Sequence, residues 1–249
     1  MENSIKFLFS GDSALVIEFG NEISVDINKK IRKMMDSIKK ENIDGIIELV
    51  PTYCSLLVNY DVLKVDYQNL VEKLKTLLND DNETVEDEEV TLIEIPTLYN
   101  DECGPDLSYV AEYNKLSKEE VIKIHTGTDY LVYMLGFMPG FTYLGGMSEK
   151  IATPRLESPR LQIYPGSVGI AGKQTGMYPS MSPGGWRIIG RTPLKLYNPD
   201  SETPVYISSG DYIRYVSISE EEYNNILKKV ESNEYKLNIH KVKRGELNA

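Results

Sequence analysis

The feature that most limits what this chain can fold into is a segment rich in glycine and proline in its second half. Residues 136–190 hold eleven of the 18 glycines, and the stretch extended to residue 193 holds seven of the 12 prolines. A proline inside a helix removes an amide donor and clashes with the preceding turn, so this segment is not mainly helical. We expect short strands and tight turns, a pattern typical of a β-barrel or β-sandwich. The strands are predicted at 168–171, 187–189, 194–197, 205–207 and 212–218.

The first 79 residues show a different pattern, in which a strand–strand–helix unit occurs twice. Two short apolar runs separated by a turn signal come first, and apolar side chains from Ile27 to Ile38 then recur with a 3.6-residue period. Two further apolar runs precede a second helical pattern, for which Asp66 is the predicted N-cap. Two such units predict a small α+β domain with helices on one face of an antiparallel sheet.

An acidic run separates the two halves of the chain. Seven acidic residues and no basic residue lie between positions 79 and 89. The charges of such a run repel one another and bury no apolar surface, so we interpret it as a solvated linker. The predicted fold is therefore an α+β domain at 1–85, a mainly β domain at 90–232 and a C-terminal tail at 233–249. Two Ser-x-x-Glu capping boxes predict helix starts inside the second domain.

The charge balance excludes some partners and favours others. The net charge is −11 with neutral histidines, which argues against sequence-independent binding to nucleic acid or to an anionic membrane. Residues 139–197 are the exception, because seven bases there stand against two acids. A basic, glycine-rich segment in an acidic protein predicts that this segment binds a small anion.

Cysteine, histidine and apolar content predict a cytoplasmic protein without a metal site. No apolar run approaches the roughly 20 residues that a membrane helix needs, and we expect no secretory signal. The two cysteines, Cys54 and Cys103, are expected to be free thiols in a reducing compartment. His125 and His240 are the two histidines, too few for a histidine-based zinc cluster.

Two glycine-bearing loops could present bare backbone amides to an anion. One contains Gly140, and the other holds Gly172, Lys173 and Gln174. Glycine permits positive φ and leaves neighbouring amides open toward a ligand. A purely structural alternative remains open, in which the first loop is a tight turn and the second is a barrel corner plugged by Trp186.

Three arginines in the basic segment are candidate anion ligands. Arg155 and Arg160 each follow a proline, and Arg187 follows the only tryptophan. A guanidinium binds carboxylate or phosphate through two parallel hydrogen bonds, and a stiff backbone reduces the entropy lost on binding. As an alternative, Arg155 or Arg160 could pair with Glu157 or remain solvated.

His125 is the candidate for proton transfer. It lies four residues after Val121, on the apolar face of a predicted helix, and imidazole is suited to proton transfer near neutral pH. The alternative is a core histidine whose ring nitrogens are both hydrogen-bonded. The Gly-x-Ser-x-Gly elbow of serine hydrolases is absent from the sequence.

Several ordered motifs span residues 125–211 and together resemble a known family. They are Gly136-Phe137-Met138-Pro139-Gly140-Phe141, Thr153-Pro154-Arg155, Ser158-Pro159-Arg160, Gly166-Ser167-Val168-Gly169-Ile170-Ala171-Gly172, Ser182-Pro183-Gly184-Gly185-Trp186 and Gly190-Arg191-Thr192-Pro193. With His125 and the opening Gly11-Asp12-Ser13-Ala14, this series resembles the allophanate hydrolase subunit 1 family. That family also covers the B subunit of 5-oxoprolinase and the sporulation-kinase inhibitor of bacilli.

The resemblance implies a cyclophilin-like β-barrel after the α+β domain, and a place in an enzyme built from several different chains. The implied partners are a 5-oxoprolinase C-subunit or allophanate hydrolase subunit 2 type protein, and an A-subunit of the lactam-utilisation type. The implied reaction is ATP-dependent hydrolysis of 5-oxo-L-proline to L-glutamate, with Mg²⁺ accompanying ATP. We assign catalysis to His125, Arg155 and Arg160. We assign substrate or phosphate binding to Gly140, Gly172, Lys173, Gln174 and Arg187.

Two other functions stay open at this point. A regulatory inhibitor of a sensor histidine kinase would show an exposed apolar patch and would tolerate loss of the arginines. Alternatively, allophanate hydrolase subunit 1 would share the ATP-linked amide chemistry but act on a different substrate.

Overall fold

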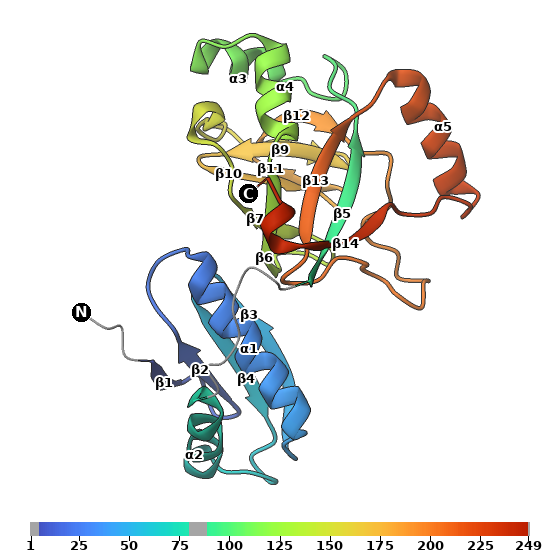
Figure 1. Ribbon diagram of the computed structural model, residues 1–249. Coiled ribbons are helices and arrows are strands. Elements are labelled where there is room, and N and C mark those ends of the chain that lie inside the picture. Colours follow the sequence, from blue (N-terminus) through green and yellow to red (C-terminus); the bar gives the residue numbers. More distant parts are fainter. Residues whose placement is uncertain (1–4, 80–88, 249) are drawn as a thin grey trace. The chain divides into compact units, whose positions relative to one another are not determined.

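The computed structural model describes residues 5–79 and 89–248. The chain divides into two compact units, Met1–Val85 and Glu86–Ala249, which are coloured blue to teal and green to red in Figure 1. Apart from its two ends, the acidic run interpreted as a linker lies outside the described residues. Each unit has its own apolar core, and each is described by itself.

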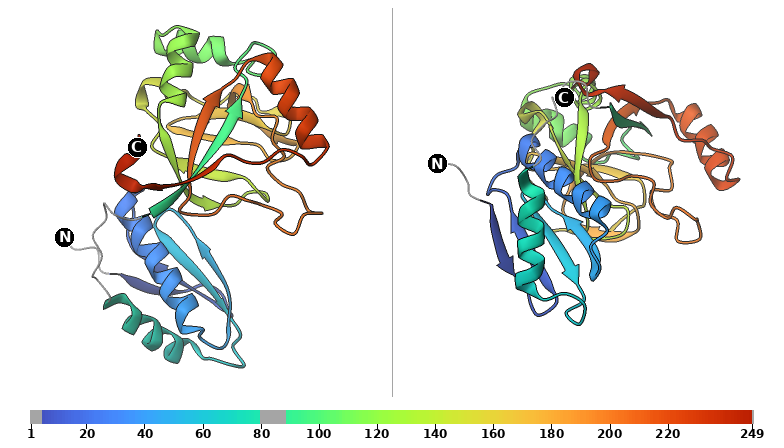
Figure 2. Two further views of the ribbon diagram at one scale, coloured as in Figure 1. Left: turned by 45° about the vertical axis from the view of Figure 1, so that its right-hand side comes forward. Right: turned by 60° about the horizontal axis from the view of Figure 1, so that its bottom comes forward.

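The first unit is a four-stranded antiparallel sheet with strand order β1-β2-β4-β3. Two helices pack against it and share a single core with it (Figures 1 and 2). Its elements are β1 (Lys6–Phe9), β2 (Ala14–Glu18), α1 (Val25–Glu41), β3 (Ile46–Pro51), β4 (Ser55–Tyr60), α2 (Tyr67–Thr76) and the 3-10 turn η1 (Leu77–Asn79).

Local sequence accounts for these elements. Ile31 and Leu70, on the apolar faces of α1 and α2, are completely buried against the sheet. Asp66 caps α2, because its carboxylate accepts a hydrogen bond of 3.0 Å from the backbone amide of Asn69. The predicted strand–strand–helix repeat is confirmed in this unit.

The second unit contains a five-stranded, a three-stranded and a two-stranded sheet among the described residues. In the five-stranded sheet, β14-β5-β13-β6-β7, strands β5 and β13 run parallel and the other neighbours antiparallel. Its strands are β5 (Glu89–Thr97), β6 (Asp129–Leu135), β7 (Thr142–Gly145), β13 (Tyr212–Ser217) and β14 (Ile239–Lys243). The two smaller sheets are β10-β9-β12 and β11-β8, formed by β8 (Arg160–Ile163), β9 (Ser167–Ala171), β10 (Gln174–Met177), β11 (Ser182–Gly184) and β12 (Arg187–Arg191).

Helices complete the second unit. They are α3 (Leu107–Asn114), α4 (Lys118–Thr126) and α5 (Glu220–Glu231), with the 3-10 turns η3 (Glu149–Ile151) and η4 (Arg244–Glu246). Both predicted capping boxes are present: Ser117 caps α4 with Glu120, and Ser219 caps α5 with Glu222. Figure 2 shows α5 on the outside of the unit, away from α3 and α4.

The architecture that the structure establishes is mixed α/β, and no sheet among the described residues closes on itself. The expected cyclophilin-like barrel is therefore not established. The strands predicted at 168–171, 187–189 and 212–218 are confirmed as β9, β12 and β13.

The strands predicted at 194–197 and 205–207 are wrong, because both segments are irregular. Leu196 and Ile207 are buried in the core of this unit, so the segments do contribute apolar side chains. Pro193 and Pro204 lack the amide donor that a strand ladder needs, which fits burial without strand pairing.

The three-stranded sheet separates two apolar layers. Val168, Ile170 and Met177 belong to the larger core of the unit. Trp186 belongs to a second cluster and packs close to Gly169 and Gly176 of strands β9 and β10. Side chains alternate between the two faces of a strand, so Val168, Ile170 and Met177 face one side of this sheet and Trp186 lies on the other side. The residues around Trp186 are therefore separated from the larger core by the three-stranded sheet.

The C-terminal segment, expected to be a tail, forms part of the second unit. Its strand β14 pairs antiparallel with β5 and becomes the edge of the five-stranded sheet. The backbone amide of Asn248 donates a hydrogen bond of 2.8 Å to the buried carboxylate of Asp129.

Candidate functional site

The structure brings three of the predicted arginines together around the only tryptophan. The guanidinium carbon of Arg155 lies 5.8 Å from the centre of the Trp186 ring. Arg160 donates from Nη1 to the Trp186 carbonyl oxygen at 3.4 Å, and Arg187 donates from Nε to the Pro154 carbonyl oxygen at 3.2 Å. We call Arg155, Arg160, Arg187 and Trp186 the arginine site.

Glycines in two strands create the seat for the tryptophan ring. A Cβ atom at Gly176 would lie 3.1 Å from Trp186 Cζ3, and one at Gly169 would lie 3.3 Å from Trp186 Cβ. Phe141 and Tyr178 contact the ring edge-to-face at centroid distances of 5.6 and 6.2 Å. The ring is therefore nearly buried and rigidly held.

A carboxylate that the sequence analysis missed lies at the centre of the arginine site. Asp106 is only 5% exposed and accepts a hydrogen bond of 2.9 Å from Arg160 Nη2. Its other oxygen accepts a hydrogen bond of 2.7 Å from the backbone amide of Ile188. Arg187 Nη1 lies 3.9 Å from the same carboxylate oxygen that Arg160 contacts. Asp106 is 54 residues from Arg160 in sequence, so no local pattern could have paired them.

The three arginines differ in how far they are already bound. Arg187 stacks on Tyr109, with its guanidinium carbon 3.7 Å from the ring centre, and its side chain is only 13% exposed. Arg160 is held by Asp106, whereas Arg155 is exposed and has no carboxylate partner among the described residues. Within the described ranges, three cations against one carboxylate leave a positive site, and Arg155 is its guanidinium group without a carboxylate partner.

The electrostatic field of the arginine site acts on Tyr178. Burial raises the pKa of Tyr178 to about 12, while Arg155 and Arg160 oppose that shift because they stabilise the phenolate. Two of the site's cations therefore lie near this hydroxyl group.

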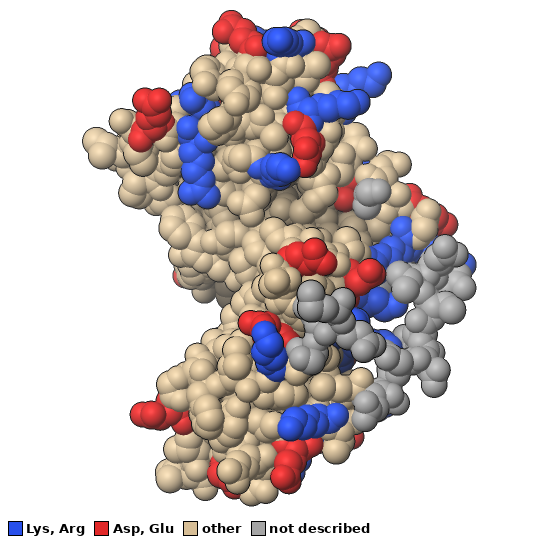
Figure 3. All heavy atoms as spheres, turned by 90° about the vertical axis from the view of Figure 1, so that its left-hand side faces the viewer, with Lys and Arg blue, Asp and Glu red and all other residues tan. Residues whose placement is uncertain are grey.

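On the molecular face drawn in Figure 3, basic and acidic side chains are interspersed and no broad basic area is visible.

His125 is completely buried, and its ring lies against Tyr130 and Tyr215 of the larger core at centroid distances of 5.6 and 4.4 Å. Its Nε2 is 2.8 Å from Thr175 Oγ1, and its Nδ1 is 2.8 Å from the hydroxyl of Tyr99. Thr175 gives its own proton to the Gly169 carbonyl oxygen at 3.1 Å. Nε2 therefore carries the imidazole proton and donates, and Nδ1 accepts from Tyr99. Burial lowers the pKa of His125 to about 3, so the ring is neutral.

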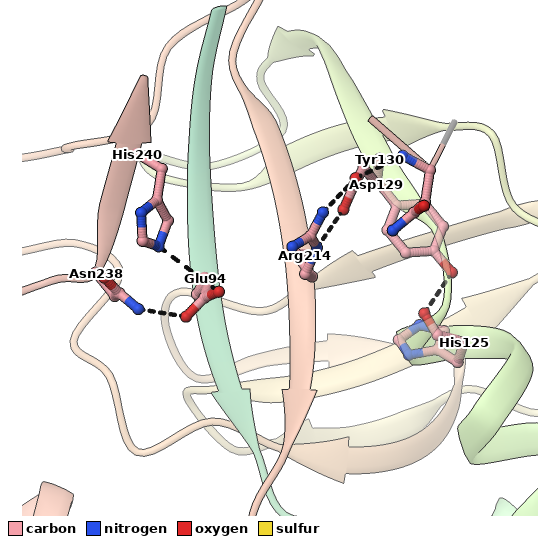
Figure 4. Close-up of polar contacts among 8 residues, drawn as sticks. Glu94, His125, Asp129, Tyr130, Arg214, Asn238 and His240 are labelled. Atoms are coloured by element: carbon pink, nitrogen blue, oxygen red, sulfur yellow. Dashed lines mark hydrogen bonds and ion pairs between the residues drawn. The ribbon is translucent and has the colours of Figure 1, made fainter. Parts of the chain in front are cut away.

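The structure does not bring His125 to the arginine site. Its partner Thr175 and the neighbouring Gly176 face opposite sides of β10, and Gly176 faces Trp186. Figure 4 shows His125 below Tyr130, whose hydroxyl donates to the His125 carbonyl oxygen at 2.8 Å. His125 therefore matches the structural alternative given in the sequence analysis, a core histidine whose two ring nitrogens are both hydrogen-bonded.

The predicted glycine loops serve as turns. In the β6–β7 connection, the amide of Gly136 donates to the Phe141 carbonyl oxygen at 3.2 Å. A Cβ atom at Gly140 would lie 2.9 Å from the Leu196 carbonyl oxygen. Gly140 is buried with φ of 82°, so its place in a tight turn requires glycine.

The second loop is the β9–β10 turn, next to the arginine site. Gly172 donates its amide to the Thr153 carbonyl oxygen at 2.8 Å, so that amide is not bare. Lys173 pairs with Glu149 at the exposed tip of the turn, and Gln174 begins β10. Since Thr153 precedes Pro154, this turn borders the segment that carries Arg155.

Similarity to known proteins identifies the family. The model for the carboxyltransferase domain, subdomain C and D, matches residues 5–207. The B subunit of 5-oxoprolinase from Bacillus subtilis is 46% identical over 224 residues, which cover 86% of this chain and 93% of the relative. The chain belongs to the 5-oxoprolinase B-subunit family. The corresponding B subunit from Escherichia coli O157:H7 is 36% identical, covering 83% of this chain and 93% of the relative.

Two solved structures are similar to this chain. A conserved uncharacterized protein from Pyrococcus horikoshii is 50% identical, with a TM-score of 0.52 and coverage of 88% of this chain and all of that chain. The urea amidolyase of Kluyveromyces lactis matches with a TM-score of 0.77 at 18% identity, over 96% of this chain and 16% of its own. That second likeness shows the fold alone. The family resemblance seen in the sequence is confirmed.

In the described part of this 5-oxoprolinase family member, neither clusters of acid, histidine and cysteine side chains nor long apolar helices give a candidate metal site or membrane span. Within residues 5–79 and 89–248, no group of three or more histidine, cysteine, aspartate or glutamate side chains could hold a metal ion. No helix in those ranges is long and apolar enough to cross a membrane. Buried Asp129 of β6 pairs with half-buried Arg214 of β13 through hydrogen bonds of 2.6 and 2.7 Å (Figure 4), and this pair joins the two strands.

Proposed function

We propose that this chain is the B subunit of an ATP-dependent 5-oxoprolinase complex that hydrolyses 5-oxo-L-proline to L-glutamate. The observation that carries the proposal is the match to 5-oxoprolinase B subunits over 93% of their length. A protein that is named as one subunit of an enzyme works together with others. We propose a C-subunit or allophanate hydrolase subunit 2 type protein, and an A-subunit of the lactam-utilisation type, as its partners.

The chemistry requires a site that binds anions. A lactam carbonyl is a poor electrophile, and transfer of the terminal phosphoryl group of ATP to its oxygen, with release of ADP, would activate the carbonyl carbon toward water. Addition of water and cleavage of the C–N bond, with a proton passing to nitrogen, would then give an acyl phosphate. Hydrolysis of that acyl phosphate would release L-glutamate and inorganic phosphate. The substrate carboxylate and the phosphate both suit guanidinium donors. We propose that Arg155, which is exposed and lacks a carboxylate partner in the described chain, contacts the anion, with Arg160 and Arg187 beside it.

The other predicted site residues have more limited roles in this proposal. Lys173 and Gln174 border the arginine site on the β9–β10 turn, and we propose them, with Gly140 and Gly172, as its surroundings rather than as bare-amide ligands. Proton transfer by His125 requires strand β10 to move, because the ring is enclosed and both nitrogens are bonded. Mg²⁺ would come with ATP.

We infer a cyclophilin-like arrangement of the second unit, supported by three sheets that enclose shared apolar cores. We place the complex in the cytoplasm, which is supported by two free cysteines, Cys54 and Cys103.

Reconstitution tests the proposed function. The chain is co-purified with its partner subunits, and glutamate released from 5-oxo-L-proline is measured with and without ATP. We expect ATP-dependent release that needs this chain. An intact complex that releases no glutamate with ATP overturns the proposal.

Direct binding is measurable because Trp186 is the only tryptophan and lies in the arginine site. Titrating the chain with ATP, inorganic phosphate or 5-oxo-L-proline should change its fluorescence. An Arg155→Ala variant should shift the titration to higher ligand concentration.

A regulatory function is the second candidate, and one observation favours it. Four large apolar side chains are exposed on the second unit near the arginine site or on the neighbouring strands: Phe137 (66%), Leu161 (89%), Tyr164 (54%) and Met181 (52%). An inhibitor of a sensor histidine kinase would use such side chains and tolerate loss of the arginines. Kinase inhibition that persists in Arg155→Ala but fails in Leu161→Asp would favour this candidate.

A further inference from the structure

We propose that Asp106 is the positioning residue of the arginine site: its carboxylate orients Arg160 and Arg187, and thereby leaves Arg155 as the cation that meets the anionic ligand. This inference rests on the proposed function, in which the arginine site binds an anion. It adds a residue that no motif in the sequence indicated.

Asp106 is fixed more firmly than a surface acid. Its backbone amide donates to the Ile188 carbonyl oxygen at 2.9 Å, and its carboxylate accepts from the Ile188 amide at 2.7 Å. Two hydrogen bonds therefore join the residue before α3 to strand β12. The side chain is almost completely buried, so water does not compete for these bonds.

The fixed carboxylate determines where the Arg160 guanidinium lies. Nη2 of Arg160 donates to Asp106 at 2.9 Å, and Nη1 reaches the Trp186 carbonyl oxygen at 3.4 Å. Because the planar guanidinium group of Arg160 donates to two fixed acceptors, its rotation is restricted. The Arg160 side chain nevertheless remains 31% exposed. Its other N–H donors stay available to a ligand without the entropy cost of ordering a free arginine.

Charge gives Asp106 a second effect. Arg160 and Arg187 approach the same carboxylate, at 2.9 and 3.9 Å, and two like charges this close repel each other unless an anion lies between them. Asp106 supplies that anion. Were Asp106 neutral, repulsion would move the two guanidinium groups apart, and they would no longer be held where Arg155 completes the site. We expect this loss of orientation to outweigh the attraction that the added net positive charge exerts on an anion.

Asp129 offers a matched control. It is also a buried aspartate paired with an arginine, Arg214, at 2.6 and 2.7 Å. It contacts none of the arginine site residues in any described interaction. Asp106→Asn and Asp129→Asn therefore each remove one buried negative charge, but only the first removes it from the arginine site.

Both variants are compared with wild type in the reconstituted complex and as the full chain. For the complex, kcat and KM for 5-oxo-L-proline are measured. For the chain, Trp186 fluorescence is titrated with inorganic phosphate, and urea unfolding measures stability. We expect Asp106→Asn to raise the phosphate dissociation constant and KM at least about tenfold with a smaller change in kcat. We expect Asp129→Asn to lower stability but to leave the phosphate dissociation constant and KM within about twofold of wild type.

Each outcome decides between the two proposals. If the complex is active and Asp106→Asn matches wild type or binds phosphate more tightly, the inference is overturned and the proposed function stands. If the complex is inactive but phosphate binding is lost only in Asp106→Asn, the proposed function fails and the inference stands. Parallel loss in both aspartate variants shows a merely structural role and overturns the inference. A wild-type chain that neither binds phosphate nor supports turnover overturns both.

A second variant covers the case in which Asp106→Asn does not fold. Arg160→Lys keeps a cation beside Asp106 but removes the planar group that bridges Asp106 and the Trp186 carbonyl. We expect the same rise in KM and in the phosphate dissociation constant. Wild-type values in Arg160→Lys would overturn the inference.

Discussion

Arg155, Arg160 and Arg187 carry the same charge, yet their surroundings give them different roles. Arg155 touches only the face of Trp186 in the described interactions, while Arg187 is bound to Pro154, Tyr109 and Asp106. Free guanidinium groups bind ligands and fully bonded ones hold structure. Arg155 is therefore the arginine whose removal should affect binding alone.

Arg155→Ala should weaken ligand binding without weakening the fold. We expect KM for 5-oxo-L-proline or ATP to rise at least about tenfold, because a charge-assisted contact contributes about 1.5–3 kcal/mol. The free energy of unfolding should change by less than about 0.5 kcal/mol, since the side chain is exposed. Lys150→Ala, an exposed cation in the same segment, is the control and should leave KM unchanged.

Burial of His125 makes the stability of the second unit depend on pH. The unfolded chain binds a proton near the ordinary pKa of 6.5, but burial lowers the pKa of His125 in the fold to about 3. Below pH 6.5 the unfolded chain therefore binds a proton at His125 that the folded chain does not bind. The free energy of unfolding is unaffected by protonation of His125 above pH 6.5 and falls by roughly 1.4 kcal/mol for each pH unit between 6.5 and 3.

Comparison with His125→Asn isolates this effect. At pH 7 we expect the variant to be about 2–4 kcal/mol less stable, because it loses ring packing and two buried hydrogen bonds. The gap from wild type should shrink between pH 6 and pH 4, as measured by urea unfolding. A gap that stays constant over this range would contradict a buried neutral imidazole.

At the scale of elements, the contact between α3 and β12 decides the geometry of the arginine site. The turn before α3 packs so closely on β12 that a Cβ atom at Gly104 would lie 2.1 Å from the Ile189 carbonyl oxygen. Two residues later, Asp106 forms its bonds to β12 and Arg160. The glycine therefore permits the approach that places the carboxylate.

Gly104→Ala should force these two elements apart. We expect a loss of about 3 kcal/mol in the free energy of unfolding, at the upper end for overpacking, since the obstacle is backbone. Ligand binding should weaken as well, because Asp106 moves with the turn. Gly185→Ala is the control: its nearest neighbour would be 3.6 Å away, so stability should change by less than about 1 kcal/mol in urea unfolding.

At the scale of the whole molecule, each unit closes around its own core, and the second unit needs the C-terminus to do so. Strand β14 covers the edge of β5, Asn238 bonds to Glu94 (Figure 4), and Asn248 bonds to Asp129. These contacts join segments more than a hundred residues apart in sequence.

Truncation after residue 232 should therefore destabilise the second unit and uncover a strand edge that promotes aggregation. We expect the urea midpoint reported by Trp186, which lies in this unit, to fall measurably. Truncation after residue 243 keeps β14 and removes the Asn248 contact, so it should have a smaller effect. Equal midpoints for wild type and the shorter chain would contradict a structural role for β14.

Much of the fold could be predicted because its signals are local. The helical periods around Ile31 and Leu70, the caps at Asp66 and Ser117, and strands β9 and β12 are each encoded within a few neighbouring residues. The sequence analysis did not predict the other strands of the glycine-rich segment, β7, β8, β10 and β11. The segments at 194–197 and 205–207 show the limit of this reasoning. Their apolar residues are buried as expected, but strand pairing also needs amide donors and a partner strand.

The sequence by itself determined the family, the two-unit pattern, the basic character of residues 139–197 and the identity of the three arginines. Only the tertiary structure decided that these arginines surround Trp186 and Asp106, that His125 is sealed in the core, and that the last residues complete a sheet. The physical reason is range: helix periods and caps depend on neighbours in sequence. Burial, pKa and ion pairing depend on groups that meet only after the chain has closed.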